Sequence, residues 1–104
     1  WGRTEALDQA DRWFRYAIEV AQRLDPGMLL IDERINTPVR LQAYCHASLA
    51  LTALMRYAAA LGADQIDAAM AWLRVAGEEA QRALINDPGN EPATQILKTL
   101  TPLQ

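Results

Sequence analysis

The residues that end helices stand at only a few places in this chain, and long helix-compatible stretches lie between them. The sequence has five glycines and five prolines in 104 residues. Two of the stops are Asp-Pro-Gly tripeptides, at 25–27 and 87–89. Proline disfavours helical geometry in the residue before it, and glycine accepts the left-handed conformation that follows many helices. This spacing of stops predicts an all-α fold made of long helices.

Apolar residues recur at three- and four-residue steps within each stretch, as they do on the buried face of a helix. Thr37 and Pro38 form a helix start, because the hydroxyl can cap exposed amides and proline at the first helical position needs no amide donor. Gly62 is the expected stop of that helix. The caps expected at the other helices are Thr4, Asp64 and Asn90. The predicted helices lie near 4–24, 37–61, 64–86 and 90–101.

The break between helices 37–61 and 64–86 is so short that the two must form an antiparallel hairpin. A chain of this length holds one hydrophobic core, so we expect a single domain over residues 1–104. It begins without Met, and we expect it to be a piece of a longer protein; no signal-peptide pattern opens it. The connector 28–36 is apolar at its start and is expected to fold back on the helices.

The apolar spacing also predicts where individual side chains lie. In helix 4–24 it places Trp13 in the core and Asp11 on the opposite, polar face. Cys45 is expected to be a small buried residue. Glu78 and Glu79 are expected on a solvated face of helix 64–86, paired with Arg82 at helical spacing.

The ends of helices 4–24 and 64–86 are similar to each other. Ala83 and Leu84, followed by Asp87-Pro88, Asn90 and Ala93, resemble the junction between successive repeats of the tetratricopeptide repeat family. The matching positions of the earlier copy are Phe14, Ile18, Ala21 and Pro26. The two prolines are 62 residues apart, whereas one family repeat spans about 34, and the helices here are longer.

This resemblance implies a tetratricopeptide-like, right-handed array of antiparallel helical hairpins with enlarged helices. It also implies that an extended peptide binds along the inner surface formed by the first helix of a pair, here 37–61. The Asp-Pro-Gly stops by themselves are equally consistent with a plain antiparallel four-helix bundle.

Composition excludes several functions. The net charge of −3 disfavours nucleic acid and anionic membranes as partners. The apolar run of helix 37–61 is too short to insert into a membrane without burying Arg56. One cysteine and one histidine are too few for a metal site built from thiolates or imidazoles. They also cannot form a catalytic pair, because Cys45 and His46 are adjacent in one helix and their side chains point about 100° apart. We therefore expect no catalysis, metal or cofactor.

A thin polar line on helix 37–61 is a candidate partner-binding strip. Its members are Arg40, Gln42, His46 and Arg56. Such a line can hold a carboxylate or a peptide backbone, or it can be the solvent edge of a central helix. Tyr16 and Trp72 lie off the centres of their apolar faces and are candidate contacts, because Tyr and Trp are enriched at interface hot spots.

These features predict a soluble, non-catalytic protein–protein interaction module that binds a peptide or a partner helix. One alternative is a structural domain that forms a homodimer or larger oligomer through its alanine-rich helices. A second alternative is a small ligand-sensing or enzymatic helical domain, which predicts a polar pocket near His46.

Overall fold

The computed structural model of the chain describes residues 2–25, 27 and 36–101, with side chains from residue 5 onward. Four helices follow one another: α1 (Gly2–Arg23), α2 (Pro38–Gly62), α3 (Ile66–Asn86) and α4 (Glu91–Leu100). No strand occurs in these ranges. The all-α prediction and the number of helices are confirmed.

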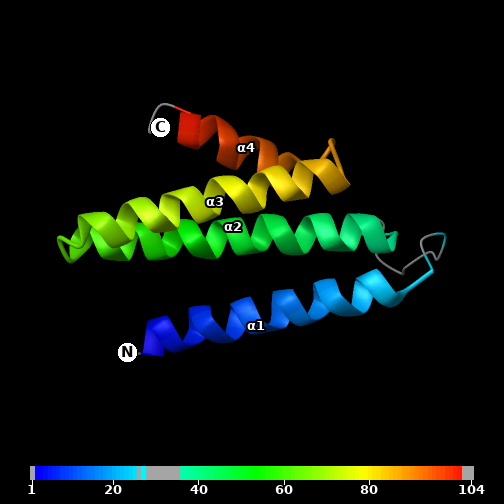
Figure 1. Ribbon diagram of the computed structural model, residues 1–104, viewed down its shortest axis with the longest axis horizontal. Helices are drawn as coiled ribbons and strands as arrows, with labels where there is room; N and C mark the ends of the chain where they lie inside the picture. Colours follow the sequence, from blue (N-terminus) through cyan, green and yellow to red (C-terminus); the bar gives the residue numbers. More distant parts are fainter. Residues whose placement is uncertain (1, 26, 28–35, 102–104) are drawn as a thin grey trace.

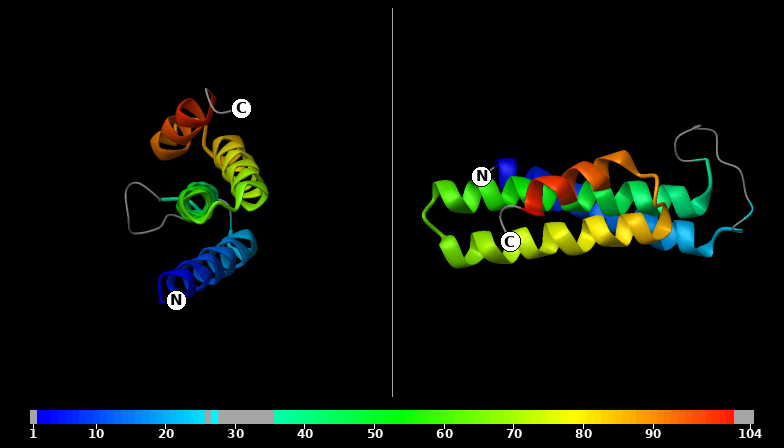
Figure 2. Two further views of the ribbon diagram at one scale, coloured as in Figure 1. Left: turned by 90° about the vertical axis from the view of Figure 1, so that its left-hand side faces the viewer. Right: turned by 90° about the horizontal axis from the view of Figure 1, so that it is seen from above.

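Each helix runs antiparallel to the one before it, and the four form a staggered row (Figures 1 and 2). The central hairpin of α2 and α3 has α1 on one side and α4 on the other. The fourth helix packs against both α3 and α2, whereas α1 packs against α2 alone among the described helices. The row is therefore open, with extents of 46 × 30 × 18 Å, and α1 is an edge helix with one neighbour among the described helices.

Two predicted helix starts are confirmed. The Thr37 hydroxyl accepts a hydrogen bond from the amide of Arg40 at 3.2 Å, and the Asn90 side chain accepts one from the amide of Ala93 at 2.9 Å. Pro38 occupies the first position of α2, where no amide donor is needed.

The two Asp-Pro-Gly stops share the same local structure. In each, the aspartate carboxylate accepts the amide of the glycine two residues later, at 2.9 Å for Gly27 and 3.1 Å for Gly89. This is the Asx turn that aspartate favours before a chain reversal. Local chemistry thus accounts for both stops.

The turn between α2 and α3 differs from the prediction. Gly62 is the last residue of α2 rather than its stop, and Asp64 adopts the left-handed conformation, with φ 58°. The amide of Gln65 donates to the carbonyl of Ala60, and that of Asp64 donates to Leu61, which is the Schellman pattern. Asp64 therefore does not cap α3, whose N-cap is Gln65 without a side-chain hydrogen bond.

The first helix begins at Gly2, so Thr4 lies inside it and is not its cap. The predicted folding back of the apolar connector falls on residues 28–35, which lie outside the described residues. None of the described helices is both long enough and apolar enough to cross a bilayer.

The core between α2, α3 and α4 is built largely from alanine. Its fully or nearly buried members are Ala43, Ala47, Ala50, Ala53, Leu73, Ala76, Ala80, Ala83, Ala93, Ile96 and Leu100. Small side chains allow helix axes to approach closely, so backbone-to-backbone packing replaces bulky side chains here. A smaller cluster of Ile18, Cys45 and Leu49 joins α1 to α2, and the prediction that Cys45 is buried is confirmed.

Candidate functional site

The N-terminal half of α1 is held to the central hairpin by polar contacts. Apolar packing between α1 and α2 centres on Ile18, Cys45 and Leu49, towards the C-terminal half of α1. The ribbons of the two helices are further apart at the N-terminus of α1 (Figure 1). A long side chain from α2, Arg56, reaches across this wider part.

Arg56 binds two carboxylates of α1. Its guanidinium donates to Asp11 and to Asp8, and the Thr52 hydroxyl donates to the other oxygen of Asp11 at 2.7 Å. Burial on its own lowers the pKa of Arg56, but the hydrogen bonds and charges of Asp11 and Asp8 outweigh it and raise the pKa above its ordinary value. The arginine is therefore charged, and it faces two carboxyl groups of α1.

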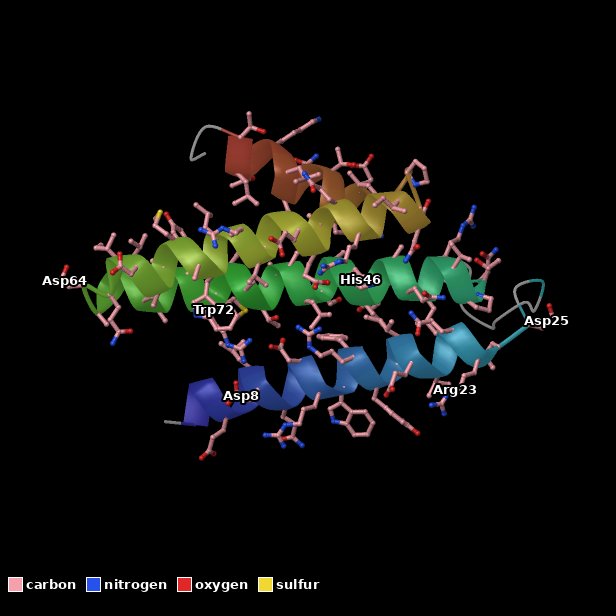
Figure 3. All side chains as sticks on the ribbon, viewed as in Figure 1. Asp8, Arg23, Asp25, His46, Asp64 and Trp72 are labelled. Carbon is pink, nitrogen blue, oxygen red and sulfur yellow. The ribbon has the colours of Figure 1, made fainter. Side chains whose placement is uncertain are left out.

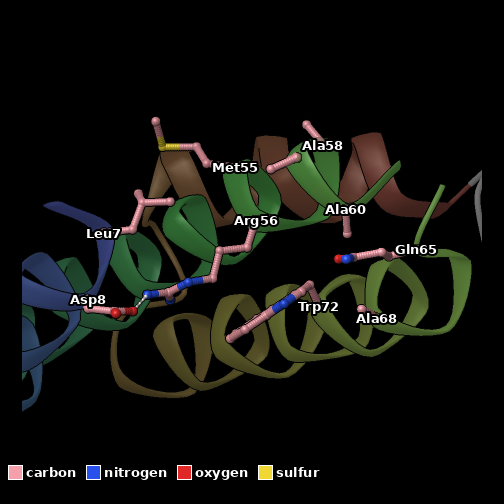
Figure 4. Close-up of a pocket in the computed structure, with 10 residues that line it drawn as sticks. Leu7, Asp8, Met55, Arg56, Ala58, Ala60, Gln65, Ala68 and Trp72 are labelled. Atoms are coloured by element: carbon pink, nitrogen blue, oxygen red, sulfur yellow. Dashed lines mark hydrogen bonds and ion pairs between the residues drawn. The ribbon is translucent and has the colours of Figure 1, made fainter. Parts of the chain in front are cut away.

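Trp72 of α3 completes this cluster. The guanidinium carbon of Arg56 lies 4.8 Å from the centre of a ring of Trp72, within the range of a cation–π interaction. Arg56 thus contacts α1 and α3 at once. Figure 4 shows its side chain extended between Asp8 and Trp72.

A cavity of about 560 Å³ opens beside Arg56 and Trp72, where the start of α1 meets the α2–α3 turn. Most of its lining is apolar, and Asp8, Arg56 and Gln65 supply the polar groups. The described residues that line it are Leu7, Asp8, Met55, Arg56, Ala58, Ala59, Ala60, Gln65, Ala68 and Trp72 (Figure 4). A mostly apolar cavity with a few polar groups is the usual form of a binding site.

The polar line predicted on α2 does not form one exposed strip. Leu49 and Ala53, which lie within it, are 2% and 1% exposed, so the line is not a solvent edge. Arg56 binds the carboxylates of α1 and lies against Trp72 of α3, whereas His46 contacts Glu79 of α3. Arg40 is exposed and donates to Asn36 at 3.0 Å, and Gln42 is half-buried.

The two candidate aromatic contacts lie in different places. Tyr16 is 54% exposed on α1, whereas Trp72 is half-buried at the cavity. The structure therefore brings together Arg56 and Trp72 from the predicted set, and it leaves Tyr16, Arg40, Gln42 and His46 outside the cavity lining. Figure 3 shows that His46 lies further than Trp72 from Asp64 and the α2–α3 turn.

His46 belongs to a second polar cluster inside the hairpin. Its Nδ1 lies 2.6 Å from a carboxylate oxygen of Glu79, whose other oxygen accepts from Arg82 at 2.6 Å. Glu79 is 3% exposed, so the prediction that it lies on a solvated face is wrong. Burial on its own raises the pKa of Glu79, but the hydrogen bond and charge of His46, together with Arg82, bring the pKa below its ordinary value.

The prediction that Trp13 lies in the core is also wrong, because its side chain is 67% exposed. Among the described helices α1 packs against α2 alone, so only a narrow face of α1 is covered. Trp13 stands at the edge of the apolar face, outside this covered part. Asp11, predicted on the opposite polar face, in fact faces α2.

The positions of Asp11 and Glu79 in the sequence already indicate that both residues lie on the covered faces of their helices. Asp11 stands four residues after Leu7 and seven before Ile18, which places it on their face of the helix. Glu79 follows Ala76 by three residues and precedes Ala83 by four. A charged residue on a buried line must find a partner there, because an unpaired buried charge is costly.

The described side chains show no assembled nucleophile. Burial raises the pKa of Cys45 to about 11, so the thiol is protonated at neutral pH, and only the thiolate is strongly nucleophilic. The Ser48 hydroxyl donates to the carbonyl of Tyr44 in the preceding turn. No group of three His, Cys, Asp or Glu side chains suited to a metal ion occurs in the described part of the chain.

Comparison with known proteins returns no relative: no protein family, curated protein or solved structure matches this chain.

We predict that Arg56→Met loosens the N-terminal half of α1. Methionine keeps the aliphatic part of the side chain but removes the guanidinium, which leaves Asp11 with Thr52 alone. We expect a loss of about 1 kcal/mol in unfolding free energy, because Asp8 is half exposed and solvent screens its pair. Amide hydrogen exchange should become faster in the first half of α1 and stay unchanged in α4. Equal exchange in both proteins would contradict the role given to Arg56.

Proposed function

We propose that this domain is a non-catalytic protein–protein interaction module that binds a peptide or a partner helix along α2. The observation that carries the proposal is the open, mostly apolar cavity beside Arg56 and Trp72. It offers an apolar anchor site with orienting polar groups next to it, and such anchors in pockets supply much of the affinity of protein interfaces.

An exposed apolar row on α2 leads to this cavity. Tyr44, Leu51 and Met55 are 49%, 54% and 46% exposed, and their spacing of seven and four residues puts them on one face. Met55 also lines the cavity, so the row and the cavity form one continuous surface. Arg40, four residues before Tyr44, stands at the other end of this row.

The charges at the cavity specify the partner further. Asp8 is paired with Arg56 yet half exposed, so it can accept a further hydrogen bond from a bound molecule. We expect the partner to place an apolar side chain in the cavity and a basic or amide group next to it, against Asp8. The net charge of −3 of the chain also favours a positively charged partner.

The resemblance to tetratricopeptide repeats supports the same surface. The four helices pack as successive antiparallel neighbours, and small alanine side chains lie where α2 and α3 approach each other. In that family the first helix of a pair forms the inner, peptide-binding surface, which corresponds here to α2. We propose a tetratricopeptide-like array on this basis.

A binding experiment tests the proposal. Peptides are selected from a displayed library on the purified domain, and their affinities are measured by calorimetry. Ala68→Arg, an exposed change in the cavity lining, should weaken the selected peptides about tenfold, because the long side chain occupies the cavity and its charge repels the basic group of the partner. Ile85→Arg, at a site that is 79% exposed and outside the cavity, is the matched control.

Circular dichroism should show the same helicity for both variants, because both sites are exposed. Selected peptides that bind the Ala68→Arg variant and the parent chain equally well would exclude the cavity as the binding site.

A further inference from the structure

A second exposed row lies on α1. Its members are Gln9, Trp13, Tyr16, Val20 and Arg23, at steps of four, three, four and three residues. This is the heptad spacing of a helix that pairs with another helix. Trp13, Tyr16 and Val20 are 67%, 54% and 38% exposed, so the centre of the row consists of large apolar side chains in contact with solvent.

The fold explains why this row is exposed. The inner face of α1 meets α2 through Ile18 and Ala21, which are 8% and 1% exposed, and the outer row lies on the far side of the helix. In the described ranges α1 has no other neighbouring helix. The row on α1 is separate from the α2 row and its cavity, so an inference about it does not depend on the proposed function.

Opposite charges stand at the last residue of the row and one turn before its first residue, so two antiparallel copies of the row would have complementary charges. Glu5 and Arg23 are both exposed and stand eighteen residues apart, which is five full turns of an α-helix. They therefore lie on the same line of α1, one at each end. An antiparallel copy of α1 would bring each Arg23 against Glu5 of the other copy, whereas a parallel copy would bring like charges together.

We propose that a second copy of this chain docks on the outer face of α1, with the two α1 helices antiparallel. Such an interface is isologous, so every contact occurs twice. The register that pairs Glu5 with Arg23 of the second copy also places Trp13 beside Tyr16 of the second copy. Burial of these aromatic side chains supplies the attraction, and the charges at the ends set the direction.

A charge-swap experiment tests the direction and the surface together. Sedimentation equilibrium of the 104-residue chain measures the dimer dissociation constant. Arg23→Glu and Glu5→Arg should each weaken the dimer about tenfold, because each creates two like-charge contacts by symmetry. The double variant restores opposite charges at both contacts and should recover the parent constant.

Trp13→Ala should weaken the dimer by at least tenfold. Arg74→Glu, the same charge change at an exposed position of α3, should leave the constant unchanged. A chain that stays monomeric at every concentration, or a dimer insensitive to Trp13→Ala, would overturn the proposal. Failure of the double variant to recover binding would exclude the antiparallel register.

Discussion

Replacing Leu100 with alanine is expected to lower the free energy of unfolding by about 2–5 kcal/mol, the range for deleting a fully buried leucine side chain. Leu100 is completely buried in the core between α2, α3 and α4 and is among the largest fully buried side chains of the described residues. The loss combines the transfer free energy of the removed atoms with the cavity left behind.

The effect should extend to the whole of α4. This helix has only ten residues, too few to be stable in water without tertiary contacts. Its buried face consists of Ala93, Ile96 and Leu100, and Leu100 fills the last of these positions. We therefore expect α4 to detach from the α2–α3 hairpin at lower denaturant than the rest of the fold.

Urea unfolding followed by circular dichroism, with amide exchange in α4, measures both effects. The matched control is Ile85→Ala, at a side chain that is 79% exposed, where the change should stay within about 0.5 kcal/mol. Equal losses for the two variants would show that α4 does not depend on Leu100.

The second large effect is expected for His46→Leu, at about 1.5–3 kcal/mol, the contribution of a hydrogen bond to a charged group. His46 lies 2.6 Å from Glu79, and the side chain of Glu79 is 4% exposed. Without His46 the buried carboxylate keeps only Arg82, which is itself half exposed. Glu78→Leu, at an exposed carboxylate next to Glu79, is the control and should stay within about 0.5 kcal/mol.

The same variant should change how stability depends on pH. The pKa of Glu79 in the folded chain lies below its ordinary value of 4.5, so this carboxylate binds fewer protons when folded than when unfolded. Its stabilisation is complete above that ordinary value and is lost as the pH falls through the lower, folded-state pKa. Loss of His46 removes a cause of the low pKa, so the variant should lose less stability over this acid range.

Urea midpoints measured at neutral pH and at successively lower pH test this expectation. A fall in stability that is equally steep in the parent and in His46→Leu would show that His46 does not set the pKa of Glu79.

Where the chemistry is local, the sequence predicted the fold well. Thr37 and Asn90 cap their helices through contacts within three residues, and both Asp-Pro-Gly stops form the same turn within three residues. Even the difference at the α2–α3 turn is small: the left-handed residue is Asp64 instead of Gly62, because aspartate also tolerates that conformation.

The candidate site was only partly predictable. Arg56 and Trp72 were recognised as unusual on their own helices, but their meeting depends on how α2 and α3 pack, and the partners of Arg56 stand 45 and 48 residues away, at Asp11 and Asp8. His46 was placed on the same line as Arg56, yet it pairs with Glu79 of α3, whereas Arg56 pairs with the carboxylates of α1.

The sequence by itself determined that the chain forms four helices, where each begins and ends to within a few residues, and that they alternate in direction. Backbone conformation, caps and stops act over a few residues, and their chemistry can be read along the chain. Only the tertiary structure decided which face of each helix is covered, because a face is buried only where a neighbouring helix lies against it. Because α2 is the one described helix that packs against α1, Asp11 faces inward and pairs with Arg56, while Trp13 is exposed to solvent.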